Sequence, residues 1–475
     1  MAQVALNVAI VASAESGHMN PMLLLAEGMA KRGHRVQVFT FAFGAGKYER
    51  RVLSFGGEFI GLPCDVAEEE QLAIAEKRNQ IPMILTRDLM KPGLSAALAG
   101  KTLDIILADF ATLAALEVAE EMKVPLVVNF PGPLKMAIQM LGAVDLTSMI
   151  SFGGIHVSTT PFSMVRVAAM FNLAGVAILS DTLCKHMTKS LVLVNSFFGL
   201  EEAVPVPPHV TIIGPLAGQD ENRKSLAETH PELHAFMADA VKAGKKVVYI
   251  TTGTMVQLEA WMIQAIFNAM KLVGCRVIWS LKEDKQAFLP KRDDPSFFVS
   301  SWLPQPALLA SDDLHAVVTH CGWGGTLECI AGAKPVIALP FFGDQPLNAT
   351  LLVEAGAAEL MGPVPGFSVK PSGLGCYKPG SITAETAAAS VRRVLDDVKY
   401  LAAARRLKQL SVAYGLGCEH ACRRIEAAAR DGMDHVINRK LEERVTGHRP
   451  AVVTMVMLGL LAGVVAAGMR IKNMR

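Results

Sequence analysis

The residues between Trp302 and Gln345 combine a glycine-rich turn with side chains that bind polar groups. The turn, HCGWGG (320–325), lies between a predicted strand (Ala316–Thr319) and a predicted helix (Thr326–Ala331). Unpaired amides at a helix N-terminus and the helix dipole favour negative charge, and glycines let a phosphate approach the backbone closely. A glycine-rich strand–helix turn is common, so the turn predicts a diphosphate site only in combination with its flanking residues.

A second group of residues suits acid–base chemistry. His18 follows the apolar run Val4–Val11, in a turn expected at the carboxyl end of a buried strand. A neutral imidazole can take the proton of an alcohol at physiological pH when a carboxylate orients it. Asp109, at the end of the predicted strand Asp104–Leu107, is the candidate carboxylate. The structural alternatives are a loop or capping histidine and an aspartate that caps the following helix.

Both groups require strands that end at a common edge. Predicted helices such as Met22–Lys31 and Leu113–Met122 alternate with short apolar runs. The runs read as strands are Val4–Val11, Arg35–Phe39, Asp104–Leu107 and Leu126–Asn129 in the first half, and Lys246–Ile250, Arg276–Ser280, Ala316–Thr319 and Pro335–Ala338 in the second. Such alternation predicts two facing, doubly wound (Rossmann-like) α/β domains, whose ligands bind at the carboxyl ends of the strands.

The chain of 475 residues is too long for one ordinary core. We expect an N-terminal domain over 1–215, a polar linker over 216–244 and a second domain over 245–435, whose last helices could pack back on the first domain. A juxtamembrane segment (436–450) would then lead to a transmembrane helix over 451–469.

Composition narrows the class of protein. Hydrophobic residues make up 51% and charged residues 19%, which excludes a mainly disordered chain. A net charge of +2 gives no reason to expect nucleic-acid binding. The eight cysteines show no repeated spacing, and the pair Cys418/Cys422 lacks the second ligand pair of a zinc site. We therefore expect free thiols, a reducing compartment and no metal.

The run from Trp302 to Gln345 resembles the signature box of UDP-dependent glycosyltransferases. The resemblance extends to about Ala429 and includes the stretches Leu193–Ser196, Leu200–Glu201 and Gly214–Leu216. It implies the two-domain GT-B architecture and, at matching positions, a UDP-sugar site. At the nucleoside, Trp302 would stack on the uracil, Gln305 would lie nearby and Glu328 would hold the ribose hydroxyls. His320 and Thr254 would contact the phosphates. The sugar would be bound by Trp323, Asp344 and Gln345. Taken singly, Trp302 could be core, His320 a strand-end histidine and Glu328 helix surface.

One position of the box departs from the plant members. Gly324 and Gly325 stand where those members usually have Asn and Ser. The backbone amides of Gly324 and Gly325 remain available to a phosphate, as does that of Gly322, but a side-chain hydroxyl that would face the phosphate is lost. Thr326 is the candidate replacement, and donor affinity is the property that the difference affects.

The resemblance implies an inverting transfer of a hexose from a UDP-sugar, with no cofactor and no metal, since no Asp-x-Asp pair lies near the box. Gln345 favours UDP-glucose, although relatives that use UDP-glucuronate share the Asp-Gln pair. The Met-rich segment Pro133–Cys184 suits an apolar hydroxylated acceptor, or ordinary helix packing. The alternatives are a lipid-pathway transferase that uses UDP-N-acetylglucosamine and a non-catalytic, membrane-bound nucleotide-sugar-binding subunit.

The apolar run Ala451–Met469 predicts a membrane partner. Its about 19 residues would form a helix of roughly 28 Å, and Arg470, Lys472 and Arg475 follow it. Gly459 and Gly463 have the spacing of a homodimer face. No basic residue precedes Val4–Val11, so we expect no signal peptide. The apolar run would then be a C-terminal anchor, and the catalytic domain would be cytosolic. If Val4–Val11 were instead a signal peptide, the catalytic domain would be luminal.

Overall fold

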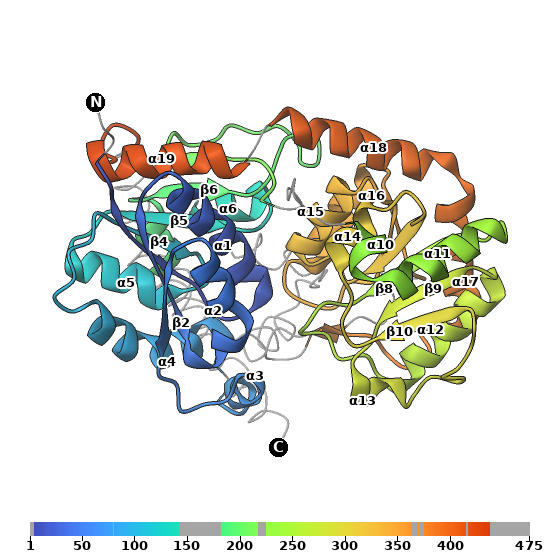
Figure 1. Cartoon of the computed structure of the whole chain (residues 1–475). Coiled ribbons are helices and arrows are strands. Elements are labelled where there is room, and N and C mark those ends of the chain that lie inside the picture. The colour runs from blue at the N-terminus through green and yellow to red at the C-terminus, as the bar shows by residue number, and fades with distance from the viewer. Residues whose placement is uncertain are drawn as a thin grey trace, which may run out of the picture.

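The computed structural model describes residues 4–78, 80–141, 182–216, 225–362, 368–369, 375–414 and 417–437. Two α/β units, each built on a parallel sheet, lie side by side (Figure 1). The prediction of two doubly wound domains is thus confirmed. Several predictions concern residues outside these ranges. They include the predicted transmembrane run 451–469 with its glycines 459 and 463, and three methionines of the Met-rich segment, Met149, Met164 and Met170.

The first sheet has seven parallel strands in the order β3-β2-β1-β4-β5-β6-β7. The strand order reverses between β1 and β4, and ligands of such sheets bind outside the carboxyl ends of the strands at this point. The strands are β1 (Asn7–Val11), β2 (Arg35–Phe41), β3 (Glu58–Leu62), β4 (Ile105–Asp109), β5 (Leu126–Phe130), β6 (Leu191–Val194) and β7 (Val210–Ile212).

Helices cover both faces of this sheet, which is why β1 is apolar from Val8 to Val11 and β4 from Ile105 to Ala108. Val8 and Ile10 of β1 belong to one apolar cluster, whereas Ala9 and Val11 belong to the cluster on the opposite face. The first cluster is covered by α1 (Ser16–Lys31) and α2 (Ala45–Ser54), and the second by α4 (Pro82–Leu98), α5 (Leu113–Met122) and α6 (Leu134–Leu141). The short helices η1 (Ala42–Gly44) and α3 (Glu68–Lys77) complete the unit.

The second sheet has six parallel strands in the order β10-β9-β8-β11-β12-β13, and its order reverses between β8 and β11. The strands are β8 (Val247–Thr251), β9 (Arg276–Ser280), β10 (Phe297–Ser300), β11 (Ala316–Thr319), β12 (Val336–Ala338) and β13 (Ala358–Leu360), and a separate antiparallel pair consists of β14 (Ser368–Val369) and β15 (Gly375–Cys376). The predicted strands Arg276–Ser280 and Ala316–Thr319 match their observed bounds, and the others shift by a few residues at their ends.

The helices of the second unit also form two layers. One layer consists of α12 (Ala260–Val273) and α17 (Ala384–Asp396), and the other of α11 (Pro231–Lys242), α14 (Gln305–Ala310), α15 (Trp323–Ala331), α16 (Gln345–Glu354) and α18 (Val398–Ala413). The remaining helices are α10 (Leu226–Thr229) and α13 (Glu283–Gln286). Part of the predicted linker is therefore folded: α11 buries Leu233, Met237 and Ala240, which have helical spacing, in the core of this unit.

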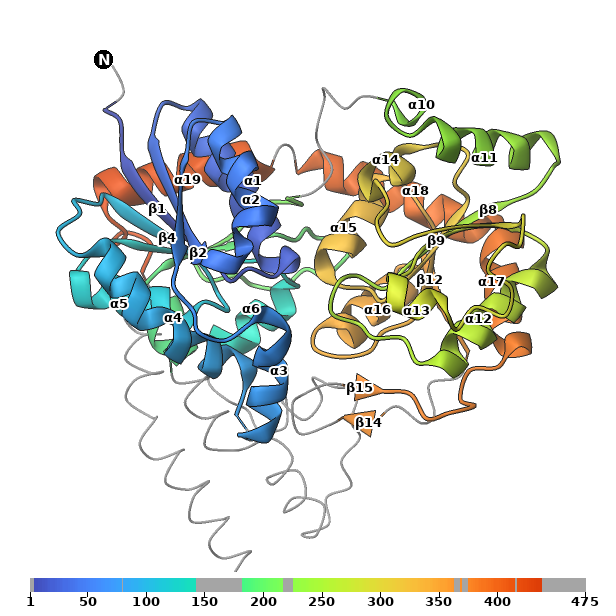
Figure 2. The same cartoon turned by 60° about the horizontal axis from the view of Figure 1, so that its bottom comes forward.

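The final helix, α19 (Gly417–Asp431), packs on α1 of the first unit, while α18 lies on the second (Figures 1 and 2). Ala421, Cys422 and Ile425 join the apolar cluster around α1. A Cβ at Gly417 would lie 2.8 Å from the Ile213 carbonyl oxygen, so the returning chain closely approaches the outgoing one. The chain therefore crosses between the units twice at neighbouring places.

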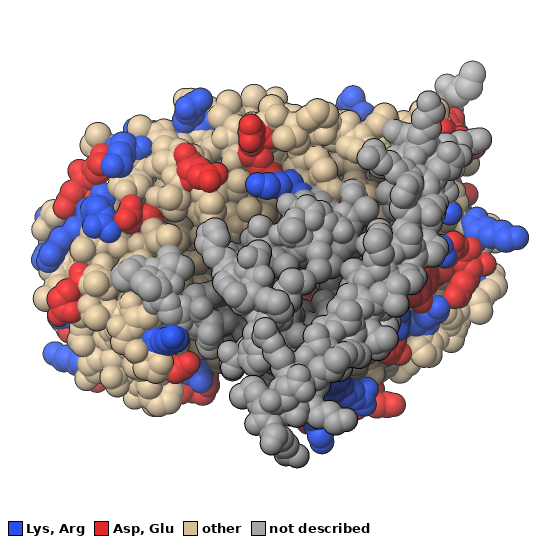
Figure 3. All heavy atoms as spheres, turned by 180° about the vertical axis from the view of Figure 1, so that it is seen from behind, with Lys and Arg blue, Asp and Glu red and all other residues tan. Residues whose placement is uncertain are grey.

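The described surface and cysteines can be compared with the composition. On the rear face, basic and acidic side chains alternate over the described surface without a patch of one sign (Figure 3). The described cysteine side chains are all free, and the described residues contain no group of three metal-binding side chains. Among these same residues, no helix has both the length and the apolar character needed to cross a membrane.

Candidate active site

The two topological switch points supply most of the predicted site residues. His18 and Asp109 follow β1 and end β4, whereas Thr254 and the HCGWGG turn follow β8 and β11. The N-terminal end of α15 is directed toward the first unit in both views (Figures 1 and 2). A direct contact joins the units there, because the indole nitrogen of Trp323 donates to the carbonyl oxygen of Asn195 at 2.9 Å.

His18 and Asp109 form a hydrogen-bonded pair. His18 Nδ1 lies 2.8 Å from Asp109 Oδ1, which also accepts the Ala111 amide at 2.9 Å. Asp109 is fully buried, while 31% of the His18 side chain is exposed. Because the carboxylate accepts a hydrogen bond from the Nδ1–H group, Nε2 of His18 is the atom that can exchange a proton with a bound molecule.

His18 lies in the first turn of α1 rather than in the predicted loop. The helix begins at Ser16 and contains Pro21 in its second turn, where proline has no amide to donate to the Gly17 carbonyl. The Phe110 ring packs beside the imidazole, with 5.8 Å between the centroids. The helix therefore fixes the direction of the imidazole toward Asp109.

The charges around His18 favour its protonated form. Burial lowers the pKa of His18, but the charge and hydrogen bond of Asp109, together with the charges of Glu15 and Asp344, raise it to about 9. Asp344 belongs to the second unit, so its electrostatic effect also shows that the two units face each other at this residue. An imidazolium must lose a proton before it can act as a base, so the rate should rise with pH.

The glycine-rich turn has a sharply bent backbone at the start of α15. Cys321 adopts a left-handed conformation with φ of 60°, and Gly322 is the N-cap of the helix. The His320 ring packs against two glycines: a Cβ at Gly322 would lie 2.6 Å from Nε2, and one at Gly253 2.7 Å from the same atom. Only glycine at both positions leaves room for this ring.

His320 is a neutral hydrogen-bonding group. Burial lowers its pKa to about 4, and Nδ1 lies 3.4 Å from the Thr319 hydroxyl. A neutral ring can donate one hydrogen bond to a phosphate oxygen, while positive potential at this end of α15 comes from the helix amides. Thr254 is exposed and directly follows Gly253, the glycine against which the His320 ring packs.

The predicted nucleoside end combines an exposed aromatic ring with a polar network. Trp302 is 67% exposed, so an indole face is available for stacking, and His230 packs beside it at a centroid distance of 5.9 Å. The alternative of Trp302 as core is thus wrong. Gln305 Nε2 donates to Glu328 Oε2, and Gln305 Oε1 accepts from the buried Tyr249 hydroxyl at 3.1 Å. The network holds Glu328 at a fixed place near the end of β8.

The residues predicted to bind the sugar lie at the start of α16. Asp344 is the N-cap, and its Oδ2 accepts from Asn348 Nδ2 at 2.7 Å. Burial raises the pKa of Asp344, although the Asn348 hydrogen bond opposes this. Gln345 is nearly buried, and its side-chain oxygen accepts the amides of Phe341 and Phe342 at 2.9 and 3.2 Å. The described contacts therefore occupy the oxygen of Gln345 and the indole N–H of Trp323.

Thr326 does not lie where a replacement hydroxyl would be needed. Its side chain is fully buried, and its hydroxyl has no hydrogen-bond partner among the described residues, so the expectation of a phosphate contact needs correction. The helical periodicity turns position 326 toward the core when positions 324 and 325 face outward. Gly324 has no atom within 4 Å of an added Cβ, and Gly325 has none closer than 3.9 Å. Packing therefore does not require glycine at either position.

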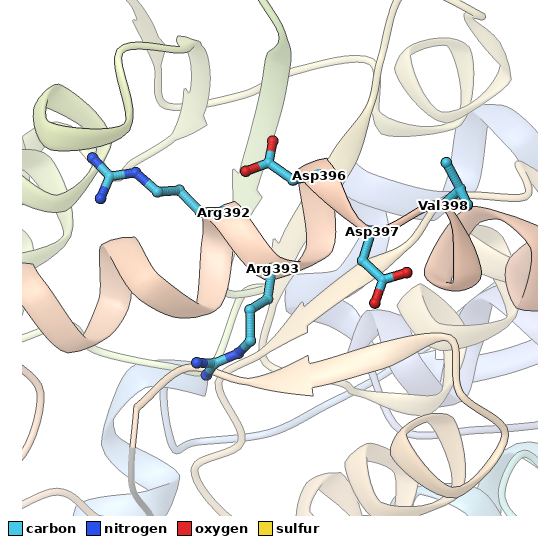
Figure 4. Close-up of a pocket in the computed structure, with 5 residues that line it drawn as sticks. All are labelled: Arg392, Arg393, Asp396, Asp397 and Val398. Carbon is cyan, nitrogen blue, oxygen red and sulfur yellow. The ribbon is translucent and has the colours of Figure 1, made fainter.

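Three contributors were not predicted: Tyr249, Asn195 and Asn348. Asn348 follows Asp344 by one helical turn, a spacing that could have indicated the pair. Tyr249 contacts the site through long-range packing, for which the local sequence has no signal. Asn195 lies in the stretch Leu193–Ser196, which the family resemblance includes without predicting a role for this residue. A hollow at the junction of α17 and α18, lined by Arg392, Arg393, Asp396, Asp397 and Val398, contains none of the predicted site residues (Figure 4).

Comparisons with known proteins agree with this geometry. Residues 176–362 match the family model "UDP-glucoronosyl and UDP-glucosyl transferase". A UDP-glycosyltransferase of Talaromyces amestolkiae is 27% identical over 297 residues, which cover 53% of this chain and 54% of that protein. UDP-glycosyltransferase stmC of Aspergillus ustus is 26% identical over 375 residues, covering 69% and 65%. The chain thus spans about half to two thirds of the length of these two curated relatives.

A solved structure extends the likeness to most of the chain. Medicago truncatula UGT71G1, complexed with UDP-glucose, has a TM-score of 0.67 at 18% identity, over 89% of this chain and 98% of that one. This likeness shows the two-domain GT-B-like fold. The sequence matches and the arrangement of the box support, together with this fold, a likeness to the UDP-glycosyltransferase family.

Proposed function

We propose that the protein transfers a hexose from a UDP-sugar, preferably UDP-glucose, to a hydroxyl of an apolar small molecule or lipid. The observation that carries the proposal is the His18–Asp109 pair at 2.8 Å, in a unit whose strand ends face the N-terminus of α15. A base in one unit and an anion site in the other are the two parts that glycosyl transfer to an alcohol needs. The UDP-glucose in the Medicago truncatula structure supports the choice of donor.

The proposed mechanism is a single displacement. Nε2 of neutral His18 takes the acceptor proton as the acceptor oxygen attacks the anomeric carbon, and buried Asp109 stabilises the imidazolium that forms. The bond to UDP breaks through an oxocarbenium-like transition state, and the α15 amides and the neutral His320 meet the charge that develops on the diphosphate. One displacement inverts the anomeric centre, so an α-linked UDP-sugar gives a β-glycoside.

The test is UDP release by the purified full chain from UDP-glucose with a panel of sterols and phenols, beside His18→Ala. Acceptor-dependent release that disappears in the variant supports the transferase. UDP-glucose binding without release by either protein would contradict it and favour the non-catalytic subunit, which has no need of a base. Release only from UDP-N-acetylglucosamine would favour the lipid-pathway alternative.

We also retain membrane attachment through residues 451–469 as part of the proposal, with the catalytic units on the cytosolic side. Its support is the uncharged composition of that run and the cations that follow it. Fractionation of cells that express the full chain, beside a chain shortened at residue 450, tests it. The attachment is contradicted if both chains are recovered equally without detergent.

A further inference from the structure

The segment Asn195–Glu201, which follows β6, contacts both units of the protein. Its first residue remains part of the first unit, because the Asn195 amide donates to the Phe130 carbonyl at the end of β5 at 3.1 Å. The carbonyl of the same residue accepts the Trp323 indole N–H at the start of α15. Asn195 therefore connects the end of β5 with the helix at the predicted diphosphate site.

The middle of the segment is embedded in the second unit. Phe197 is 1% exposed and belongs to the apolar cluster that contains α15 and α18. The Phe198 amide donates to the Tyr414 hydroxyl at 3.2 Å, and the Phe197 and Tyr414 rings pack with centroids 6.0 Å apart. These contacts fix the middle of the segment on the second unit.

The last residue, Glu201, holds the start of α6 in the first unit. Its two carboxylate oxygens accept the Leu134 and Lys135 amides at 2.7 and 2.9 Å, and Oε1 also accepts the Ser196 hydroxyl. Glu201 is 7% exposed, so its charge is compensated by these bonds and by the positive end of the α6 dipole. It therefore satisfies two amides that have no partner within α6.

α6 begins next to the catalytic edge of the first sheet. It follows β5, whose Asn129 pairs in register with Asp109 of β4. Glu201 bonds both to α6, which follows the strand next to Asp109, and to the Ser196 hydroxyl. Ser196 is covalently joined to Asn195, whose carbonyl accepts the Trp323 indole N–H. Each step of this path is a hydrogen bond or a peptide link between described residues.

We propose that Glu201 is a positioning residue for sugar transfer, which sets the start of the donor-site helix α15 against the acceptor-side helix α6 through Ser196 and Asn195. The proposal rests on the function proposed above. Glu201 touches neither of the predicted reacting groups, so it acts by fixing the Asn195 carbonyl that receives the Trp323 N–H. Loss of its carboxylate loosens the contact between the units and leaves the UDP site within the second unit intact.

The variant Glu201→Gln tests the proposal with little change in shape. Glutamine has one acceptor oxygen, and its NH2 group would face a backbone N–H of α6, so one amide loses its partner. The Ser196 hydroxyl loses its acceptor as well when the NH2 group takes the place of Oε1. Glu202→Gln is the matched control, because Glu202 is the neighbouring residue and is exposed. Ser196→Ala removes only the link to Asn195 and serves if Glu201→Gln does not fold.

The first readout does not depend on catalysis. The full chain has four tryptophans, so its 15N-tryptophan spectrum contains few indole N–H signals, and Trp323→Phe assigns the one of interest. We expect Glu201→Gln and Ser196→Ala to shift this signal and to speed its exchange with water by at least about tenfold, with Glu202→Gln unchanged. An unchanged Trp323 signal in both variants would overturn the proposal, even if activity falls.

The second readout separates positioning from a general disturbance. We expect Glu201→Gln to lower kcat about tenfold while the Kd for UDP changes less than twofold. The kcat of the double variant Glu201→Gln with Trp323→Phe should be no lower than that of the worse single variant. Equal losses in kcat and UDP binding, or losses that multiply in the double variant, would refute it. A wild-type chain that binds UDP without transfer would refute the proposed function, whereas the indole signal would still decide the role of Glu201.

Discussion

The substitution Asp109→Asn removes the charge that faces His18 and keeps the shape of the side chain. The ordinary pKa of histidine is 6.5, and that of His18 is raised to about 9. Since one pKa unit corresponds to about 1.4 kcal/mol, the surroundings favour the imidazolium by about 3 kcal/mol. Asp109 provides most of the interaction that raises this pKa, and burial opposes it. In the variant we therefore expect the pKa of His18 to fall to about 6.5 or below.

Two consequences for the rate follow, with opposite signs. In the wild type, we expect kcat/KM to rise with pH up to about 9, because neutral His18 is the proposed base. In Asp109→Asn this rise should be complete near pH 7, but at a plateau about 100-fold lower. The lower plateau follows because the amide cannot stabilise the imidazolium of the transition state, and about 3 kcal/mol corresponds to about 100-fold in rate.

The assay is UDP release between pH 6 and 10, together with NMR titration of the His18 ring in both proteins. Asp65→Asn is a matched control, since Asp65 is an exposed aspartate of the same unit. A His18 pKa that stays near 9 in Asp109→Asn, or a pH profile that does not move, would refute the reasoning.

The same pair also predicts how stability depends on pH. Because the pKa of His18 is raised in the folded state, the pair stabilises the fold fully below about pH 6.5, and this contribution is lost as the pH rises through about 9. Urea unfolding at pH 6 and 9.5 should show a decrease in the wild type that is smaller in Asp109→Asn. An equal decrease in both proteins would mean that other groups control it.

Three further predictions concern the turn and the final helix. Gly325→Ala should raise the free energy of unfolding by up to about 1 kcal/mol in denaturant titrations, because the site is helical and its added Cβ has no neighbour closer than 3.9 Å. Gly322→Ala should weaken UDP binding at least about tenfold by titration calorimetry with the fold retained, since its Cβ would displace His320; unchanged affinity would contradict the assignment of this turn. Glu426→Gln should cost about 3 kcal/mol, because it breaks the bidentate pair with Arg32, at 2.7 and 2.9 Å. The Arg32 hydrogen bond lowers the pKa of Glu426 to about 2, so wild-type stability should fall from about pH 4.5 toward 2, and acid unfolding of the variant should lack this contribution.

Local pattern determined the strands and indicated most of the candidate site residues. The apolar runs at β9 and β11 have the predicted bounds because both faces of each strand are buried, so neither face can be polar. The strand–helix alternation places His18, Asp109 and the glycine-rich turn at strand ends before any contact is known. The spacing from Trp302 to Gln345 is likewise a property of the sequence, since those residues share consecutive elements of one unit.

Only the tertiary structure decided which polar atoms are occupied and how the units meet. Whether Thr326 faces a ligand or the core depends on the direction in which α15 packs, and α15 buries it. The folding of α11 within the predicted linker and the return of α19 to α1 depend on apolar faces finding partners far along the chain. The pKa of His18 and the bonds of Glu201 depend on groups many residues away, and a hydrogen bond between such groups has no local signal in the sequence.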